Sequence, residues 1–387
     1  MRDAHRLVRE WMTGAGMICR LDPATNLIGR RPARTAGPGA EQVVIIGSHL
    51  DSVVNAGRYD GPLGVLMGIA LVEMAEAAAL ELPFALDVVA FCEEEGVRYQ
   101  APFIGSSALA GNLTAEHLAA RDAAGVTLEQ AIREFGGDPA KLADAVYPAE
   151  GVIAYIEPHI EQGLSLEANN LPIGVVTGIA GQSRAGVAFI GQAGHAGTVP
   201  MAARRDALTA AAEWISDVER IALAEPGLVA TVGRLELAPN VANVIPAMVS
   251  LSLDVRHLDD NVRQDRLRRI LDSAVAVARR RSVSFDVAWS HEQETTPCDP
   301  RLVDEMCSAV RDVGVRLLPL ASGAGHDGVA LARKFPIAML FVRCAGGVSH
   351  HPSESVAEQD VAVALEALER LIARLADRRR VDRVNGQ

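Results

Sequence analysis

Two short apolar segments on either side of a helical stretch constrain the fold of this chain more than any other feature. Residues 43–46 and 86–91 are apolar and largely β-branched, and they are predicted to be buried strands. Residues 64–80 between them are rich in Ala, Leu and Met and are predicted to form a helix. Because parallel strands need such a crossover, this order predicts a parallel α/β sheet, with functional groups at the carboxyl ends of its strands.

The pattern changes near residue 182 and returns to helix, strand and helix after residue 295. Between these points strand-like and helical segments mix, at 185–190, 206–223, 230–237, 249–255, 262–280 and 283–287. The last part is predicted to contain a helix at 301–313, a strand at 338–342 and a helix at 355–378. We therefore expect an α/β fold whose mostly parallel-sheet catalytic domain, 1–181 plus 295–387, is split by an inserted α+β domain, 182–294.

Composition and charge exclude several classes of protein. Lys and Arg number 37 against 49 Asp and Glu, and no long basic stretch is present, so we expect no nucleic-acid partner. The most apolar stretch, 64–80, carries Glu73 and Glu76, so we expect no membrane partner. No apolar signal segment follows Met1, which favours a cytoplasmic location. The cysteines show no C-x-x-C pair, so neither a disulfide framework nor a thiolate zinc site is expected.

Acidic and histidine side chains gather just after the two predicted strands. His49 and Asp51 are two residues apart and share one face, so His49 could ligate a metal while the Asp51 carboxylate accepts its other ring N–H. Asp60 stands in a glycine-flanked turn, where helix capping is the alternative role. In the triplet 93–95, carboxylates about 4 Å apart repel by roughly 4 kcal/mol at an effective dielectric near 20, which solvent or a divalent cation must offset. With a cation present, one carboxylate is a ligand and its neighbour a general base.

Two further histidines extend this set. His159 lies in the segment EPHIEQG, and His350 lies in SHHP beside His351, which is the alternative ligand there. Each histidine alone is more often a hydrogen-bonded core or surface residue than a ligand. Together with His49, Asp60 and a glutamate of the triplet, they form a nitrogen and oxygen donor set that suits zinc, manganese or cobalt. The sequence therefore predicts a metal site.

A series of longer segments, in order along nearly the whole chain, carries a resemblance to a known family. The segments are GSHLDSVVNAGRYDGPLGV (47–65), EEEGVRY (93–99), HIEQG (159–163), GHAGTVPMAARRDAL (194–208), NVIP (243–246), DVRH (254–257), SGAGHDG (322–328) and GGVSHHPSES (346–355). They resemble the amidase branch of the dinuclear-metal peptidase and amidohydrolase superfamily. That branch comprises allantoate amidohydrolase, N-carbamoyl-L-amino acid hydrolase and β-ureidopropionase.

The resemblance implies a centre of two divalent metal ions, zinc or manganese, with cobalt and nickel as alternatives. Asp60 would bridge the ions, and the remaining ligands would be His49, Glu95, His159 and His350. Glu94 would be the general base that takes a proton from the attacking water. Asp51 would position His49, with a turn-stabilising role as the alternative.

The resemblance also implies residues that contact the substrate. Arg256 would bind a substrate carboxylate with both arms of its guanidinium, unless it forms a surface ion pair. Asn243 and Gln162 would bind ureido or carboxylate oxygens, and His326 would line the pocket. His195, otherwise a turn residue, would come from the partner subunit of a homodimer and stabilise the developing oxyanion. The insert would then be a lid and dimerisation domain.

The implied activity is hydrolysis of the carbamoyl C–N bond of a small ureido carboxylate, with release of ammonia and carbon dioxide. The segments 171–184 and 194–208 favour allantoate, and N-carbamoyl-L-amino acid hydrolase or β-ureidopropionase is the alternative. A dinuclear-metal peptidase and a metal-free binding homologue are further alternatives. The chain departs from the family where Thr25 and Gly328 replace the usual Gly and Ala, and we expect relatives to begin some tens of residues earlier.

Overall fold

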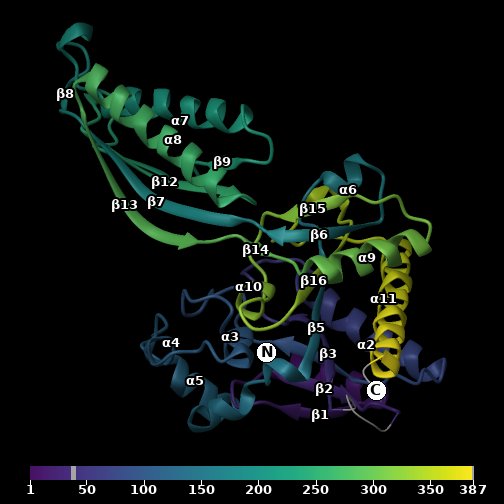
Figure 1. The fold of residues 1–387 in the computed structure, drawn as a ribbon. Helices are drawn as coiled ribbons and strands as arrows, with labels where there is room; N and C mark the ends of the chain where they lie inside the picture. The colour runs from purple at the N-terminus through teal and green to yellow at the C-terminus, as the bar shows by residue number, and fades with distance from the viewer. Residues whose placement is uncertain (36–40, 386–387) are drawn as a thin grey trace. The chain divides into compact units, whose positions relative to one another are not determined.

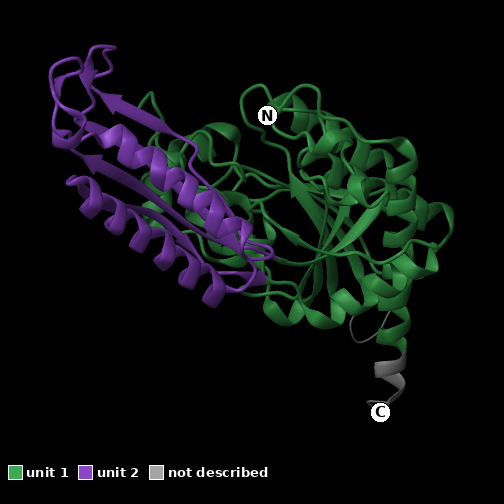
Figure 2. Ribbon diagram, turned by 90° about the horizontal axis from the view of Figure 1, so that it is seen from above, with its two compact units in different colours: residues 1–178, 297–387 green, residues 179–296 purple. Residues whose placement is uncertain are grey.

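The structure is a computed structural model that describes residues 1–35 and 41–385, with side chains described up to residue 380. The chain divides into two compact units, which are coloured separately in Figure 2. Unit 1 comprises Met1–Gly178 with Pro297–Gln387, and unit 2 comprises Ile179–Thr296. Unit 1 is thus discontinuous in sequence, whereas unit 2 is one continuous segment.

Unit 1 is built on a mixed sheet, nine-stranded among the described residues, whose centre is parallel (Figure 1). The parallel strands are, in spatial order, β4 (Ala85–Phe91), β3 (Val43–His49), β5 (Val152–Ile160) and β16 (Ile337–Val342). Beyond them lie β1 (Ile18–Leu21) and β2 (Leu27–Arg31) on one side, and β6 (Ile173–Ile179), β14 (Thr296–Pro297) and β15 (Pro319–Ser322) on the other. The predicted α/β class with a mostly parallel central sheet is confirmed.

The helices of unit 1 explain why its central strands are mostly apolar. Every residue of β3 and β4 is buried, as expected for strands that are covered on both faces. One core cluster joins β3, β4, β5 and β16 to the helices α1 (Arg2–Gly14), α2 (Pro62–Ala77), α9 (Pro300–Asp312) and α11 (Glu358–Asn385). The short helix α10 (Gly328–Leu331) contacts β5, β16 and α3 (Ile104–Ala110).

Unit 2 has an antiparallel sheet with two long helices. Its strands are β10 (Leu235–Ala238), β12 (Met248–His257), β7 (Gly181–Ile190) and β13 (Ser284–Gln293) in spatial order, and β9 (Val229–Thr231) also pairs with β12. The helices α7 (Ala207–Leu223) and α8 (Asp260–Arg281) share one core cluster with this sheet. A separate two-stranded ribbon joins β8 (Gly194–His195) to β11 (Val244–Ile245).

The structure corrects two details of the elements predicted from the sequence. The single strand predicted at 230–237 is two strands, β9 and β10, which both pair with β12; between them the N–H of Arg234 donates to the hydroxyl of Ser252. Strand β3 is longer than predicted and ends at His49 itself. Thr25, where the family usually has Gly, still adopts the left-handed backbone conformation with φ 77°.

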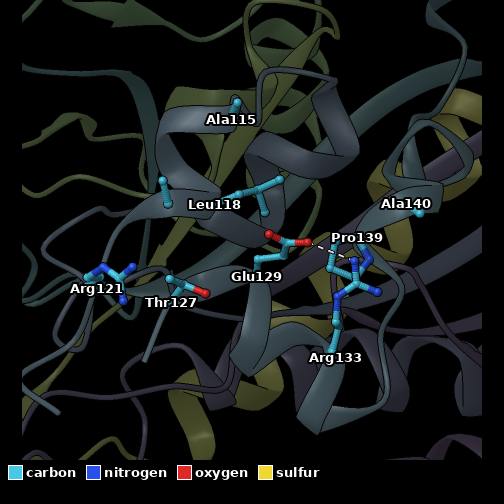
Figure 3. A pocket seen from close by; sticks show the side chains of 9 residues that line it. Ala115, Leu118, Arg121, Thr127, Glu129, Arg133, Pro139 and Ala140 are labelled. Carbon is cyan, nitrogen blue, oxygen red and sulfur yellow. Dashed lines mark hydrogen bonds and ion pairs between the residues drawn. The ribbon is translucent and has the colours of Figure 1, made fainter. Parts of the chain in front are cut away.

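Two further observations concern the outside of the molecule. Among the described residues, none of the helices combines the length and the apolar character that a bilayer crossing requires. An open hollow of about 460 Å³ lies beside α4 (Ala115–Ala119) and α5 (Leu128–Phe135), where Glu129 and Arg133 form an ion pair (Figure 3). None of the candidate site residues lines this hollow.

Candidate metal centre

The fold of unit 1 brings together groups that follow neighbouring strands. β3 ends at His49, β5 carries His159 one residue before its end, and these two strands pair in parallel. Glu95 follows β4, the other parallel neighbour of β3, and Asp60 precedes helix α2. His350 lies in the loop between β16 and α11. Carboxyl ends of parallel strands share one edge of a sheet, and this explains the meeting of residues so far apart in sequence.

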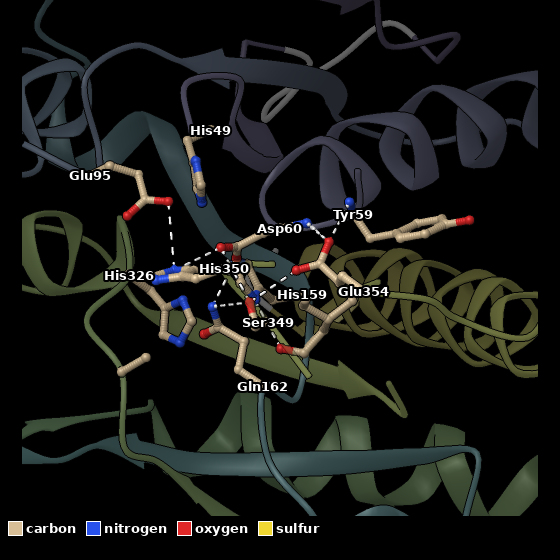
Figure 4. Close-up of polar contacts among 12 residues, drawn as sticks. His49, Tyr59, Asp60, Glu95, His159, Gln162, His326, Ser349, His350 and Glu354 are labelled. Atoms are coloured by element: carbon tan, nitrogen blue, oxygen red, sulfur yellow. Dashed lines mark hydrogen bonds and ion pairs between the residues drawn. The ribbon is translucent and has the colours of Figure 1, made fainter. Parts of the chain in front are cut away.

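The five predicted ligands form two groups that share one carboxylate. His49, Asp60 and His159 each place a ligand atom within 4.8 Å of the others, and so do Asp60, Glu95 and His350. Figure 4 shows these side chains converging on Asp60 from separate elements. Three imidazoles and two carboxylates are a donor set suited to zinc, manganese or cobalt.

The two buried imidazoles have their tautomers set by the main chain. Nδ1 of His49 lies 2.9 Å from the carbonyl oxygen of Asp51, and Nδ1 of His159 lies 2.9 Å from that of Ile160. A carbonyl only accepts, so each Nδ1 carries the proton and each Nε2 keeps its lone pair. Nε2 of His159 has no hydrogen-bond partner within the described part of the chain. An imidazole oriented in this way is ready to bind a metal.

Asp60 sits at the centre as a buried anion. Burial alone would raise its pKa, but the hydrogen bond from His350 and the electrostatic effect of the neighbouring imidazoles outweigh burial and lower the pKa. Oε1 of Glu95 is buried without a hydrogen-bond partner among the described residues. A buried acceptor and a buried Nε2 that form no hydrogen bond, beside a central carboxylate, fit two divalent cations.

The loop at 349–354 distinguishes the two adjacent histidines. Nε2 of His350 lies 2.9 Å from Oδ2 of Asp60 and 3.7 Å from Oε1 of Glu95. The hydrogen bond with Asp60 raises the pKa of His350. His351 is exposed, and its Nδ1 lies 2.7 Å from the hydroxyl of Ser353. The geometry therefore favours His350 over His351 as the candidate ligand.

The prediction that the Asp51 carboxylate accepts the ring N–H of His49 is wrong. That carboxylate is 3.8 Å from Nδ1 of His49, and the Asp51 main-chain carbonyl accepts the ring N–H instead. The two carboxylate oxygens accept the N–H groups of Glu94 and Glu95, each at 3.0 Å. Since β3 ends at His49, the strand geometry assumed for Asp51 does not continue to it. Asp51 thus fixes the backbone of the acidic turn.

Glu94 belongs to a buried acidic cluster, and the sequence patterns did not predict its other members, Glu157 and Asp327. Its pKa is raised well above the ordinary value by burial and then by the charges of Asp327 and its neighbours. Glu157 is also buried, accepts the N–H of Gly328 at 3.0 Å, and has its pKa raised to about 7 by burial. Burial likewise raises the pKa of Asp327. Glu157 stands two residues before His159 on β5, so strand alternation could have identified it.

Two predicted substrate contacts lie beside the candidate ligands. Nε2 of Gln162 donates to Oδ1 of Asp60 at 2.9 Å and to the hydroxyl of Ser349 at 3.0 Å. The buried ring of His326 lies 4.5 Å from the ring of His159, centroid to centroid, and its Nε2 is 2.7 Å from the Ser322 hydroxyl. Burial lowers the pKa of His326, so its ring is neutral near pH 7.

The remaining predicted groups lie in unit 2, where none of them is buried. His195 is exposed on β8, and its Nδ1 accepts the N–H of Gly197 at 3.1 Å. Asn243 is exposed just before β11, the strand that pairs with β8. Arg256 on β12 donates through two nitrogens to both oxygens of Asp254, at 2.7 and 2.9 Å. The ion pair considered as the alternative for Arg256 is therefore present.

Comparisons with known proteins agree over most of the chain. The model of peptidase family M20/M25/M40 matches residues 45–374. An N-carbamoyl-L-amino acid amidohydrolase of Geobacillus stearothermophilus is 41% identical, over 97% of this chain and 91% of the relative. An allantoate amidohydrolase of Bacillus subtilis is 33% identical, over 97% and 90%. The crystal structure of a hydantoinase/carbamoylase family amidase from Burkholderia ambifaria has a TM-score of 0.89 at 34% identity, over 97% and 90%.

Proposed function

The chain belongs to peptidase family M20/M25/M40 and is a hydrolase of carbon–nitrogen bonds, and we propose that it removes the carbamoyl group of a small ureido carboxylate. The observation that carries this proposal is the pair of ligand groups sharing Asp60. The named amidohydrolase relatives support it, because they match nearly the whole chain.

In this proposal two divalent ions would occupy the centre. His49, Asp60 and His159 would hold one ion, and Asp60, Glu95 and His350 would hold the other. Zinc and manganese suit this donor set, with cobalt and nickel as alternatives. When bound, such ions lower the pKa of water and act as Lewis acids toward a carbonyl.

Glu94 is the proposed general base. Its carboxylate would accept a proton from the attacking water while the water oxygen bonds to the carbamoyl carbon. The C–N bond then breaks, and the proton passes from Glu94 to the leaving nitrogen. The carbamic acid so formed decomposes to ammonia and carbon dioxide. Burial raises the pKa of Glu94, which makes it a stronger base than an exposed carboxylate.

The substrate contacts are part of the same proposal. Arg256 would bind the substrate carboxylate with its planar fork, and Asn243 and Gln162 would bind polar oxygens of the substrate. His326 would line the pocket, and His195 would act from the partner subunit of a homodimer. Unit 2 would then serve as a lid and dimerisation domain. The exposure of His195 supports this role, since a group that acts on another chain must be accessible.

Allantoate is the proposed substrate. The segments 171–184 and 194–208 support it, and a relative named allantoate amidohydrolase is 33% identical. N-carbamoyl-L-amino acids are the second candidate, because the relative with that name is 41% identical. Specificity of this kind depends on a few polar contacts in the pocket.

A substrate panel tests the proposal. Protein loaded with zinc or manganese would be assayed for ammonia release from allantoate, N-carbamoyl-L-amino acids and N-carbamoyl-β-alanine, and for cleavage of dipeptides. We expect the highest kcat/KM for allantoate. A preference for N-carbamoyl amino acids would select the second candidate. Cleavage of dipeptides alone would indicate a peptidase, and binding of a ureido carboxylate without turnover would indicate a binding homologue.

A further inference from the structure

Glu354 is a buried carboxylate beside the candidate metal centre that no role in the proposed reaction uses. Only 4% of it is exposed, and within the described part of the chain no Lys, Arg or His forms an ion pair with it. Three donors satisfy it instead. Oε1 accepts the N–H groups of Tyr59 at 2.7 Å and Asp60 at 3.1 Å, and Oε2 accepts the hydroxyl of Ser349 at 3.0 Å. Burying an anion is costly unless donors satisfy it, and these three hydrogen bonds hold the side chain in place.

These bonds join two loops that are far apart in sequence. Tyr59 and Asp60 precede α2, whereas Ser349 directly precedes His350, and the bond from Tyr59 to Glu354 spans 295 positions. Figure 4 shows the side chain of Glu354, which belongs to the His350 loop, beside Tyr59, Asp60 and Ser349. One carboxylate therefore sets the distance between the shared candidate ligand and His350.

The hydrogen bonds continue from Glu354 to the side chain of Asp60. The Ser349 hydroxyl has one proton, which goes to Glu354 at 3.0 Å in preference to Oδ2 of Asp60 at 3.4 Å. The same hydroxyl accepts from Gln162, whose amide also donates to Oδ1 of Asp60. Glu354 thus fixes the Asp60 main chain directly and orients two groups that contact the Asp60 carboxylate.

Gly57 provides the space that Glu354 occupies. A Cβ atom at position 57 would overlap the carboxyl group of Glu354. The φ of Gly57 is not among the positive values, so close approach and not backbone conformation requires glycine here. Substitution at position 57 would therefore displace Glu354 without touching any candidate ligand.

We propose that Glu354 is a positioning residue, which holds the Asp60 loop and the His350 loop at the spacing that two divalent ions require. This inference rests on the proposed function. It implies that loss of Glu354 lowers metal affinity, beyond any loss of stability. Groups that orient metal ligands are typically worth 10- to 100-fold in affinity.

The test measures zinc affinity and the Tm of the metal-free protein in parallel. The variants are Glu354→Ala, Glu354→Gln and Gly57→Ala. Glu305→Ala is the matched control for loss of a buried glutamate, since Glu305 pairs with Arg374 and Arg378 away from the centre. Gly14→Ala is the control for Gly57→Ala, because a Cβ at position 14 meets no atom within 4 Å.

We expect Glu354→Ala and Gly57→Ala to weaken zinc binding by about 10- to 100-fold. Glu354→Gln keeps an oxygen for the two N–H groups and should restore part of the affinity. Both controls should bind zinc as the wild type does, even where their Tm falls. Wild-type affinity in Glu354→Ala and Gly57→Ala would overturn the inference alone. A wild-type protein that binds no divalent ion would overturn the proposed function and this inference with it.

Discussion

The candidate ligands in unit 1 and the candidate substrate contacts in unit 2 are built in opposite ways. His49, Asp60 and His159 are buried, come from separate elements and meet one another within 4.8 Å. His195 and Asn243 are exposed; His195 lies on β8, and Asn243 directly precedes β11, the strand that pairs with β8. Packing of unit 1 alone assembles the first set, whereas nothing within unit 2 encloses the second.

This difference predicts how substitutions in each set should change metal content and turnover. Buried ionisable groups are costly unless something compensates them, so their arrangement indicates a bound charge. Exposed groups contribute little to the free energy of unfolding, so their removal should leave the structure intact. Changes of the candidate ligands in unit 1 should therefore alter metal content, and changes of the exposed groups in unit 2 should alter turnover alone.

Asp60→Asn is expected to have the largest effect. The amide is neutral and cannot bridge two cations, so both ions and all measurable turnover should be lost. Metal analysis of the purified variant by mass spectrometry checks this outcome. A variant that keeps both ions would contradict the prediction, because the shared carboxylate would then not be a ligand.

Glu94→Gln should lower kcat by roughly 10² to 10⁴-fold while both ions remain bound, as expected for loss of a general base. Ammonia release and metal content would be measured on the same sample. Glu93→Gln is the matched control on the neighbouring residue, and its turnover should stay near the wild-type value. Near-normal activity of Glu94→Gln would refute its role.

His195→Ala should lower kcat by roughly 10² to 10³-fold, the range for loss of one oxyanion donor. Because the side chain is exposed, the Tm and the metal content should not change. His291→Ala, also in unit 2, is the control and should retain full activity. Loss of bound metal in the His195 variant would contradict the separation of roles between the two units.

Arg256→Lys should have the smallest effect, a rise in KM of about 10-fold with little change in kcat. Lysine keeps the charge but loses the fork that binds a carboxylate through two hydrogen bonds. Steady-state kinetics with the preferred substrate separates the two constants. A fall in kcat with unchanged KM would indicate that Arg256 serves Asp254 and the fold instead of the substrate.

Local patterns in the sequence predicted the parallel strands and the helix between them. An apolar run that ends in His49 and another that ends before Glu93 are enough to place groups at one sheet edge. The resemblance to a known family supplied the ligand set, and the structure brings those five residues together.

The remaining features of the site depend on contacts between residues far apart in sequence, which local patterns do not predict. Glu354 bonds to Tyr59 across 295 positions, and the Asp51 carboxylate bonds to the backbone at residues 94 and 95. Such contacts are set by packing and by the need to satisfy each buried polar group.

Anomalous diffraction from a crystal of the metal-loaded protein tests directly whether two ions bind and share Asp60. Data collected on both sides of the zinc absorption edge would locate every bound ion. We predict two peaks per chain, one bound by His49 and His159 and the other by Glu95 and His350, with Asp60 bound to both. A single peak, or peaks bound by residues outside this set, would contradict the proposed two-metal centre.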